Sequence, residues 1–137
     1  MPSIHLRRVL PALSLLLVGC MEDQGERPCD LWTASAVVSG TITNSSGAPV
    51  PSAAVDVEVA STHPCDGTET WTRTDRVTTD ASGSYSARLE IGNSRGNRCV
   101  RVTEVASGVS ASGEVEFVGG CGVVRPPGQL SLQLVIP

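Results

Sequence analysis

The sequence has few aromatic side chains, and this scarcity limits how its core can be built. Two tryptophans, one tyrosine and one phenylalanine are present among 137 residues. A core with so few rings must be filled by Val, Leu, Ile and Ala, a composition that suits a β-protein. From Ser35 onward the sequence also lacks the periodicity of an amphipathic helix. Both absences favour an all-β fold.

Basic residues are in the minority, with 10 Lys and Arg against 14 Asp and Glu and a formal net charge of −4. A surface that binds nucleic acid needs clustered basic residues. Here they are separated by acids and serines, which excludes nucleic acid as a partner and predicts solvated strand faces. These residues are Arg73, Arg76, Arg88, Arg95, Arg98 and Arg101.

No apolar run reaches the length of about 20 residues that a membrane-spanning helix needs. The longest extends from Val9 to Val18, is interrupted by Pro11 and Ser14, and follows two arginines. This pattern has the length and the basic flank of a signal peptide.

Residues 15–20 (LLLVGC) close this run and resemble a bacterial lipobox. The resemblance implies cleavage after Gly19 and acylation of Cys20 by a diacylglyceryl thioether, which anchors the chain in a membrane. We therefore divide the sequence into a signal peptide (1–19), a lipidated tether (20–34) and one domain (35–137). Because Met21 replaces the Asp of inner-membrane retention, a Gram-negative cell would place the protein in its outer membrane, and another cell in its plasma membrane. The alternative is an ordinary secretory signal with Cys20 as a free thiol.

Four cysteines remain once Cys20 is lipidated: Cys29, Cys65, Cys99 and Cys121. An even number in an oxidising compartment predicts two disulfides. The expected strand order places all four at one pole, and we favour the pairs Cys29–Cys65 and Cys99–Cys121. A four-thiolate zinc site is the alternative, but wide spacings without a C-x-x-C pair disfavour it, so no metal ion is expected.

Apolar and polar residues alternate in repeated short segments, as in strands that bury one face. Val55, Val57 and Val59, for example, alternate with Asp56 and Glu58, and segments rich in Asn, Asp, Ser and Gly separate the strands. Gly113 leaves a gap or a bulge in the sixth strand. This spacing predicts a seven-stranded antiparallel Greek-key β-sandwich. Its strands are 35–43, 53–60, 71–78, 84–91, 98–105, 109–118 and 129–136.

Residues 40–44 (GTITN), 47–57 (GAPVPSAAVDV) and 79–86 (TDASGSYS) resemble the hallmark segments of the carboxypeptidase regulatory-like domain. The resemblance implies a prealbumin-like (transthyretin-like) sandwich in which these residues shape turns and do no chemistry. Gly47 and Gly83 are expected to adopt positive φ, and Asp80 to form an Asx-turn. Ser52 stands where the family often has glycine.

Few residues suggest a site. His63, which has Cys65 and Asp66 as near neighbours, can be drawn as a metal or catalytic cluster, but a polar loop beside a disulfide is the favoured interpretation. No calcium-loop motif is present. Trp32 and Trp71 are candidate contacts for a sugar or a peptide, although Trp71, at the start of a strand, is expected to be buried.

The sequence therefore predicts a lipid-anchored, extracytoplasmic protein of the cell envelope that is not an enzyme and needs no cofactor. Its partners would be the membrane, through Cys20, and an unidentified protein or glycan. The alternative is a dedicated glycan- or peptide-binding module that uses the tryptophans or a bare sheet edge.

Overall fold

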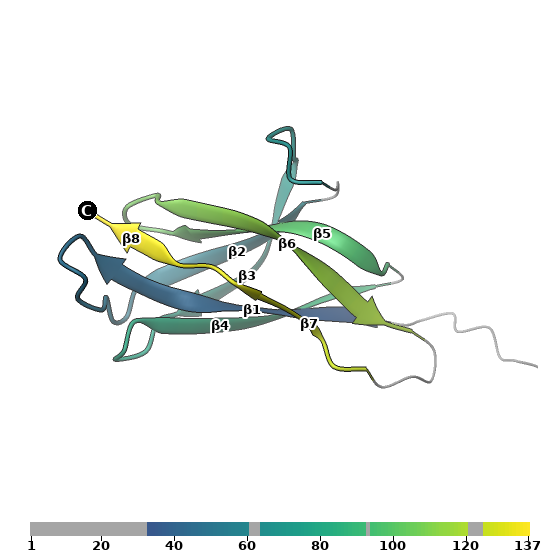
Figure 1. Cartoon of the computed structure of the whole chain (residues 1–137), viewed down its shortest axis with the longest axis horizontal. Helices are drawn as coiled ribbons and strands as arrows, with labels where there is room; N and C mark the ends of the chain where they lie inside the picture. Colours follow the sequence, from purple (N-terminus) through teal and green to yellow (C-terminus); the bar gives the residue numbers. More distant parts are fainter. Residues whose placement is uncertain (1–32, 61–63, 93, 121–124) are drawn as a thin grey trace, which may run out of the picture.

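The computed structural model describes residues 33–60, 64–92, 94–120 and 125–137, which form eight β-strands and no helix (Figure 1). The strands are β1 (Thr33–Asn44), β2 (Ala54–Ala60), β3 (Trp71–Thr78), β4 (Ser84–Gly92), β5 (Gly96–Glu104), β6 (Ser110–Gly119), β7 (Gly128–Ser131) and β8 (Leu134–Ile136). The all-β prediction is confirmed. Within these ranges, no helix is long and apolar enough to cross a membrane.

The strands follow the order β3-β2-β5-β6-β1-β4, and β7 and β8 pair with β1. β1 and β4 pair along most of their length, whereas β1 and β6 share only the pairs Ala34↔Gly119 and Ser35↔Val118. The sheet therefore curls at the β1–β6 junction into a nearly closed, barrel-like body with β3 and β4 at its edges (Figure 1). The Greek-key sandwich topology stays a prediction.

The C-terminal segment differs from the prediction in two ways. The expected strand 129–136 is divided into β7 and β8, and both run parallel to β1. The ladder is interrupted at Leu132 and Gln133, and the side-chain oxygen of Gln133 accepts a 3.2 Å hydrogen bond from the backbone N–H of Thr41. The structure therefore has eight strands instead of seven, and their pairing is not wholly antiparallel.

The core lies on the faces that the alternation predicted. Val55 and Val57 of β2 are fully buried, as are Val100 and Val102 of β5. Gly113 makes no bulge, because the β5–β6 register is continuous through it, and the side chains of Leu130 and Leu132 fill the space where its Cβ atom would stand. The remaining members of the core are Val59 of β2, Ala53 just before this strand, and residues of the other strands: Ala34, Ala36, Val38, Ile42, Tyr85, Ala87, Leu89, Val115, Phe117 and Leu134.

The predicted turn chemistry is confirmed. Gly47 and Gly83 have φ of 82° and 73°. The Asp80 carboxylate accepts hydrogen bonds from the N–H groups of Ser82 (2.8 Å) and Ser84 (3.0 Å), which makes the Asx-turn. The Ser82 hydroxyl also donates to it, and together these bonds lower the pKa of Asp80.

Candidate functional site

Residues 64–70, the described part of the loop before β3, are attached to the outer face of the sheet. Cys65 forms a disulfide with Cys99 of β5, with 5.3 Å between their Cα atoms. The predicted pairs Cys29–Cys65 and Cys99–Cys121 are therefore wrong for Cys65 and Cys99, while Cys29 and Cys121 lie outside the described residues. The physical reason is the alternation of side chains along β5. Val100 points into the core, so the side chain of its neighbour Cys99 points to the outer face, where Cys65 lies.

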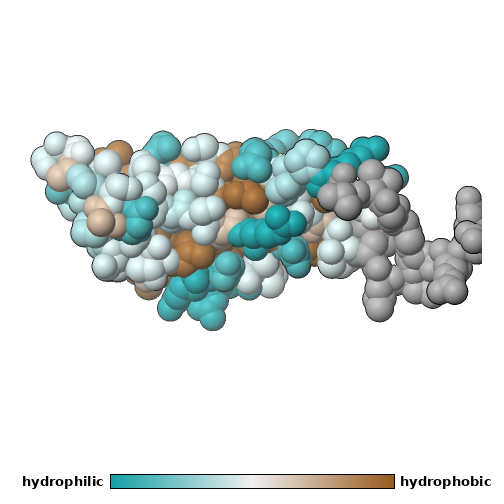
Figure 2. Space-filling view, turned by 90° about the horizontal axis from the view of Figure 1, so that it is seen from below, coloured by the Kyte–Doolittle hydropathy of each residue, from teal (hydrophilic) through white to brown (hydrophobic). Residues whose placement is uncertain are grey.

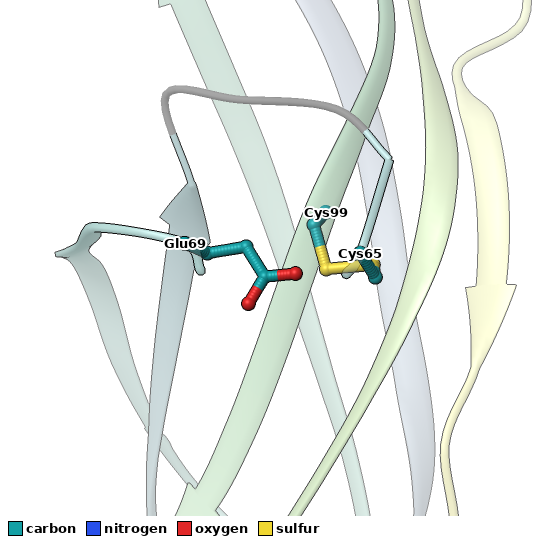
Figure 3. A group of neighbouring side chains, drawn as sticks. All are labelled: Cys65, Glu69 and Cys99. Atoms are coloured by element: carbon teal, nitrogen blue, oxygen red, sulfur yellow. A yellow bond between two sulfur atoms is a disulfide. The ribbon is translucent and has the colours of Figure 1, made fainter. Parts of the chain in front are cut away.

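Glu69 points toward the disulfide (Figure 3), and one of its carboxylate oxygens lies within 4.8 Å of both sulfur atoms. Thiolates and carboxylates are metal ligands, but two sulfurs joined to each other are not thiolates. Glu69 instead accepts a hydrogen bond from the N–H of Gly67 (3.0 Å), and Asp66 accepts one from the N–H of Thr68 (2.9 Å). The Thr68 hydroxyl also donates to Asp66 and lowers its pKa.

The carboxylates of this loop therefore shape its turn. His63 lies outside the described residues, so the favoured interpretation, a polar loop beside a disulfide, and its alternative, a cluster with Cys65 and Asp66, both stay predictions. The backbone N–H of Cys65 donates to the carboxylate of Glu114 on β6, which attaches the loop to a second strand.

Beside this loop, the outer face of β3, β2 and β5 carries a set of paired charges. Arg76 of β3 makes two hydrogen bonds to Asp56 of β2, from Nε (2.6 Å) and Nη2 (2.8 Å), and Arg73 approaches the same carboxylate at 3.9 Å. The hydrogen bond from Arg76 holds the pKa of Asp56 below its usual value.

A break in the strand register explains how Arg73 and Arg76 reach one carboxylate. Residues three apart on a regular strand point to opposite faces. Here the β2–β3 register shifts between Val57 and Glu58, so Thr74 has no partner on β2 and both arginines pair with outward-facing residues.

Trp71 and Arg101 meet across β2 on the same face. The Arg101 guanidinium lies 4.5 Å from the centre of the Trp71 ring and donates a 2.7 Å hydrogen bond to Glu58. Trp71 pairs with Ala60, whose small side chain leaves room for this contact. The ring is held as a cation–π partner between β3 and β5.

We call this surface the Trp71 face. It comprises Trp71, Arg73 and Arg76 of β3, Asp56 and Glu58 of β2, and Arg101 of β5.

The two tryptophan predictions have different outcomes. Trp71 is half-buried instead of buried, because Arg101 covers it and no core side chains enclose it. Trp32 lies outside the described residues, as does Cys20. The strand-borne arginines Arg73, Arg76, Arg88 and Arg101, predicted to be simply solvated, are each within ion-pairing distance of a carboxylate.

Other parts of the described surface are less organised. The face shown in Figure 2 mixes small hydrophobic and hydrophilic areas. A hollow of about 640 Å³ lies at the end of the sheet away from Thr33, where Val50, Ala53, Val105 and Ile136 give it a mainly apolar lining. The charged residue that lines this hollow, Glu104, is used internally, since its carboxylate accepts hydrogen bonds from the N–H groups of Ala106 (3.0 Å) and Ser107 (2.6 Å).

Comparison with known proteins gives structural neighbours only. No protein-family model and no curated protein sequence matches the chain. Among solved structures, it is similar to catechol 1,2-dioxygenase from Acinetobacter sp. ADP1 (TM-score 0.43, 14% identity, 83% of this chain and 55% of that one). It is also similar to catechol 1,2-dioxygenase from Pseudomonas arvilla C-1 (TM-score 0.42, 15% identity, 83% of this chain and 54% of that one).

The chain spans about half the length of these dioxygenases. The prediction that the protein is not an enzyme is corrected at this point, because these structural neighbours are enzymes. The likeness concerns the β-rich fold and carries no substrate over to this chain.

Proposed function

We propose that the protein is a lipoprotein of the cell envelope, anchored outside the cytoplasm by acyl chains on Cys20. Its domain would engage an envelope protein or glycan close to the membrane. The main support for a location outside the cytoplasm is the Cys65–Cys99 disulfide, since such bonds form and persist in oxidising compartments. The lipobox-like residues 15–20 supply the matching export and anchoring signal.

The domain is proposed to be a Greek-key sandwich of the carboxypeptidase regulatory-like kind. The turns at Gly47 and Gly83 and the Asx-turn at Asp80 support this proposal, because they fall in the segments that resemble the family. Ser52 has a φ of 58°, a left-handed conformation at the position where the family often has glycine.

The Trp71 face is the proposed interaction surface. Tryptophan and arginine are enriched among the residues that dominate binding energies. The hydrogen bond from Arg101 to Glu58 fixes the guanidinium beside the ring, so little side-chain freedom is lost when a partner binds. The half-buried ring and the planar guanidinium that lies over it offer contacts for stacking to a sugar ring or a planar peptide group.

The anchor is tested by metabolic labelling with a palmitate analogue, followed by membrane fractionation of the wild type and of Cys20→Ser. We expect label and membrane association in the wild type and neither in the variant. Recovery of the intact, unlabelled chain from the cytosol with Cys65 and Cys99 reduced would contradict the proposal.

The interaction surface is tested by screening envelope glycans and secreted peptides with the wild type, Trp71→Ala and Arg88→Ala. Arg88 is a matched control because it is an exposed arginine of β4, outside the Trp71 face. We expect Trp71→Ala to weaken binding by about 30-fold, the effect of losing a dominant contact residue, and Arg88→Ala to leave it unchanged. Equal binding by all three folded proteins would rule out this surface.

A further inference from the structure

Two arginines differ from the others in the part of the chain that the structure describes. Four arginines of the strands pair with carboxylates, and Arg98 donates to the Ser94 hydroxyl. Arg95 and Arg125 have neither an ion pair nor a hydrogen bond within the described ranges. Both side chains are exposed. The guanidinium groups of Arg95 and Arg125 can therefore bind another molecule without first breaking an ion pair, unlike those of the paired arginines.

Arg95 and Arg125 line the same hollow, although they are far apart in the sequence. Its volume is about 330 Å³, and its lining also includes Gly96, Glu116 and Gly119. The strand register explains the meeting, since Gly96 of β5 pairs with Phe117 near the end of β6. A Cβ atom at Gly96 would meet nothing within 4 Å, so the hollow is open on that side.

This hollow lies at the end of the sheet where the described chain begins. Gly119 pairs with Ala34 at the start of β1, next to Thr33. In Figure 1 this is the end at which β6 terminates beside the beginning of β1. The opposite end, formed by the turns at 44–53, 79–83 and 105–109, contains no arginine and includes Asp80. Both arginines therefore lie at the Thr33 end of the domain, which also carries the acidic residues Asp66, Glu69 and Glu116.

We propose that Arg95 and Arg125 bind the phosphate of an anionic phospholipid headgroup and seat this end of the domain on the membrane. A planar guanidinium can make two parallel hydrogen bonds to a phosphate, and two of them on one hollow suit a single headgroup. The proposal rests on the anchor at Cys20, which would hold this end of the domain nearest the bilayer. A phospholipid is favoured over free phosphate by this placement.

Glu116 gives the proposal an internal check. Glu116 lines the same hollow, and a carboxylate there would repel a phosphate. Glu116→Gln is therefore expected to strengthen binding, whereas Arg95→Gln and Arg125→Gln weaken it.

The test uses the processed chain 20–137 with Cys20→Ser, oxidised and without acyl chains. Removing residues 1–19 removes no part of the described fold and prevents their apolar run from entering the bilayer. Co-sedimentation is measured with vesicles of phosphatidylglycerol and phosphatidylcholine and with vesicles of phosphatidylcholine alone. Inorganic phosphate is added as a competitor in a third arm.

We expect binding to the phosphatidylglycerol vesicles that each arginine substitution weakens about five-fold, since a basic residue near an anionic surface contributes about 1 kcal/mol. Arg88→Gln is the control, because it removes the same charge from an arginine paired with Glu90 on β4. High salt should weaken the binding.

Three results would overturn the proposal: no preference for phosphatidylglycerol, an equal loss with Arg88→Gln, or displacement by inorganic phosphate at the concentration of the lipid headgroups. The last would identify free phosphate as the ligand. Because the assay contains no acyl chain, its failure is separate from a failure of the palmitate labelling at Cys20.

Discussion

The hydroxyl of Tyr85 donates a 2.6 Å hydrogen bond to the backbone carbonyl of Leu132. Tyr85 belongs to β4, on one side of β1, and Leu132 lies between β7 and β8, on the other side. The backbone N–H of Leu132 also donates to the carbonyl of Ser39 on β1 (2.8 Å). Leu132 is therefore held through both its N–H and its carbonyl group, and the nearly buried tyrosine joins the C-terminal segment to β4.

Tyr85→Phe removes this hydrogen bond while keeping the ring in the core. We expect the free energy of unfolding to fall by about 1–3 kcal/mol, because the carbonyl of Leu132 loses its partner away from water. Urea denaturation of the oxidised protein measures the change, and an unchanged denaturant slope would show that the folded state is preserved. A variant as stable as the wild type would mean that water replaces the hydroxyl at no cost.

The same phenol makes the fold sensitive to alkali. Burial raises the pKa of Tyr85 from 10.0 to about 12, so the folded state keeps its proton at pH values where the unfolded chain releases it. The stabilisation is complete below pH 10 and is lost as the pH rises from 10 to about 12.

Tyr85 is the single tyrosine of the chain, so the ultraviolet absorbance of tyrosinate reports its titration directly. In Tyr85→Phe, the part of the loss of stability at alkaline pH that comes from ionisation of this phenol should be absent. Ionisation near pH 10 in the folded protein would contradict the prediction.

The strands could be predicted from the sequence because their determinants are local. The predicted strand 71–78 coincides with β3, and 84–91 differs from β4 by one residue. Alternation defines the buried face of such strands, and the Asx-turn at Asp80 follows from short contacts of its own side chain. Neither feature depends on which strands become neighbours.

What the sequence did not reveal depends on pairing between distant segments. The alternation of apolar and polar residues in 129–136 does not show whether the segment runs parallel or antiparallel to its neighbour. The parallel pairing with β1 was therefore missed. No residue type marks Thr74 as the bulge that turns Arg73 and Arg76 to one face. The acidic residues of β2 and the arginines of β3 and β5 could have indicated the ion pairs of the Trp71 face. No feature of the sequence indicated that Arg95 and Arg125 lie close together, since only the β5–β6 register brings them to the same end of the sheet.

Gly47 and Gly83 form a matched pair for the effect of an added methyl group. Both have positive φ, and Ala costs about 1–2 kcal/mol in that conformation. At Gly47 a Cβ atom would meet nothing within 4 Å, whereas at Gly83 it would lie 2.6 Å from the carbonyl oxygen of Ile42. We expect Gly83→Ala to destabilise the protein by about 1–3 kcal/mol more than Gly47→Ala, measured by thermal unfolding. Equal losses would show that the chain around Ile42 relaxes freely.

The Cys65–Cys99 disulfide closes a segment with a sequence separation of 34. By loop entropy, the double variant Cys65→Ala, Cys99→Ala should be less stable by about 3–4 kcal/mol. Urea denaturation measures this loss, and the wild type treated with a dithiol reductant is the comparison. Non-reducing peptide mapping should recover the Cys65 peptide linked to the Cys99 peptide, and the same digest reports the partners of Cys29 and Cys121. A link between Cys65 and Cys29 would contradict the structure.

The contact between Trp71 and Arg101 should appear as a coupling energy in a double-mutant cycle. Trp71→Leu and Arg101→Gln, singly and together, are compared by urea denaturation with the disulfide intact. We expect a coupling of about 0.5–1 kcal/mol, because Arg101 is one-third exposed and water screens part of the attraction. Arg101→Lys keeps the charge but loses the planar group, so it should retain less than the full coupling. If the two single effects add without coupling, the ring and the guanidinium are neighbours that do not stabilise each other. The Trp71 face would then lack the rigidity on which its proposed role in binding depends.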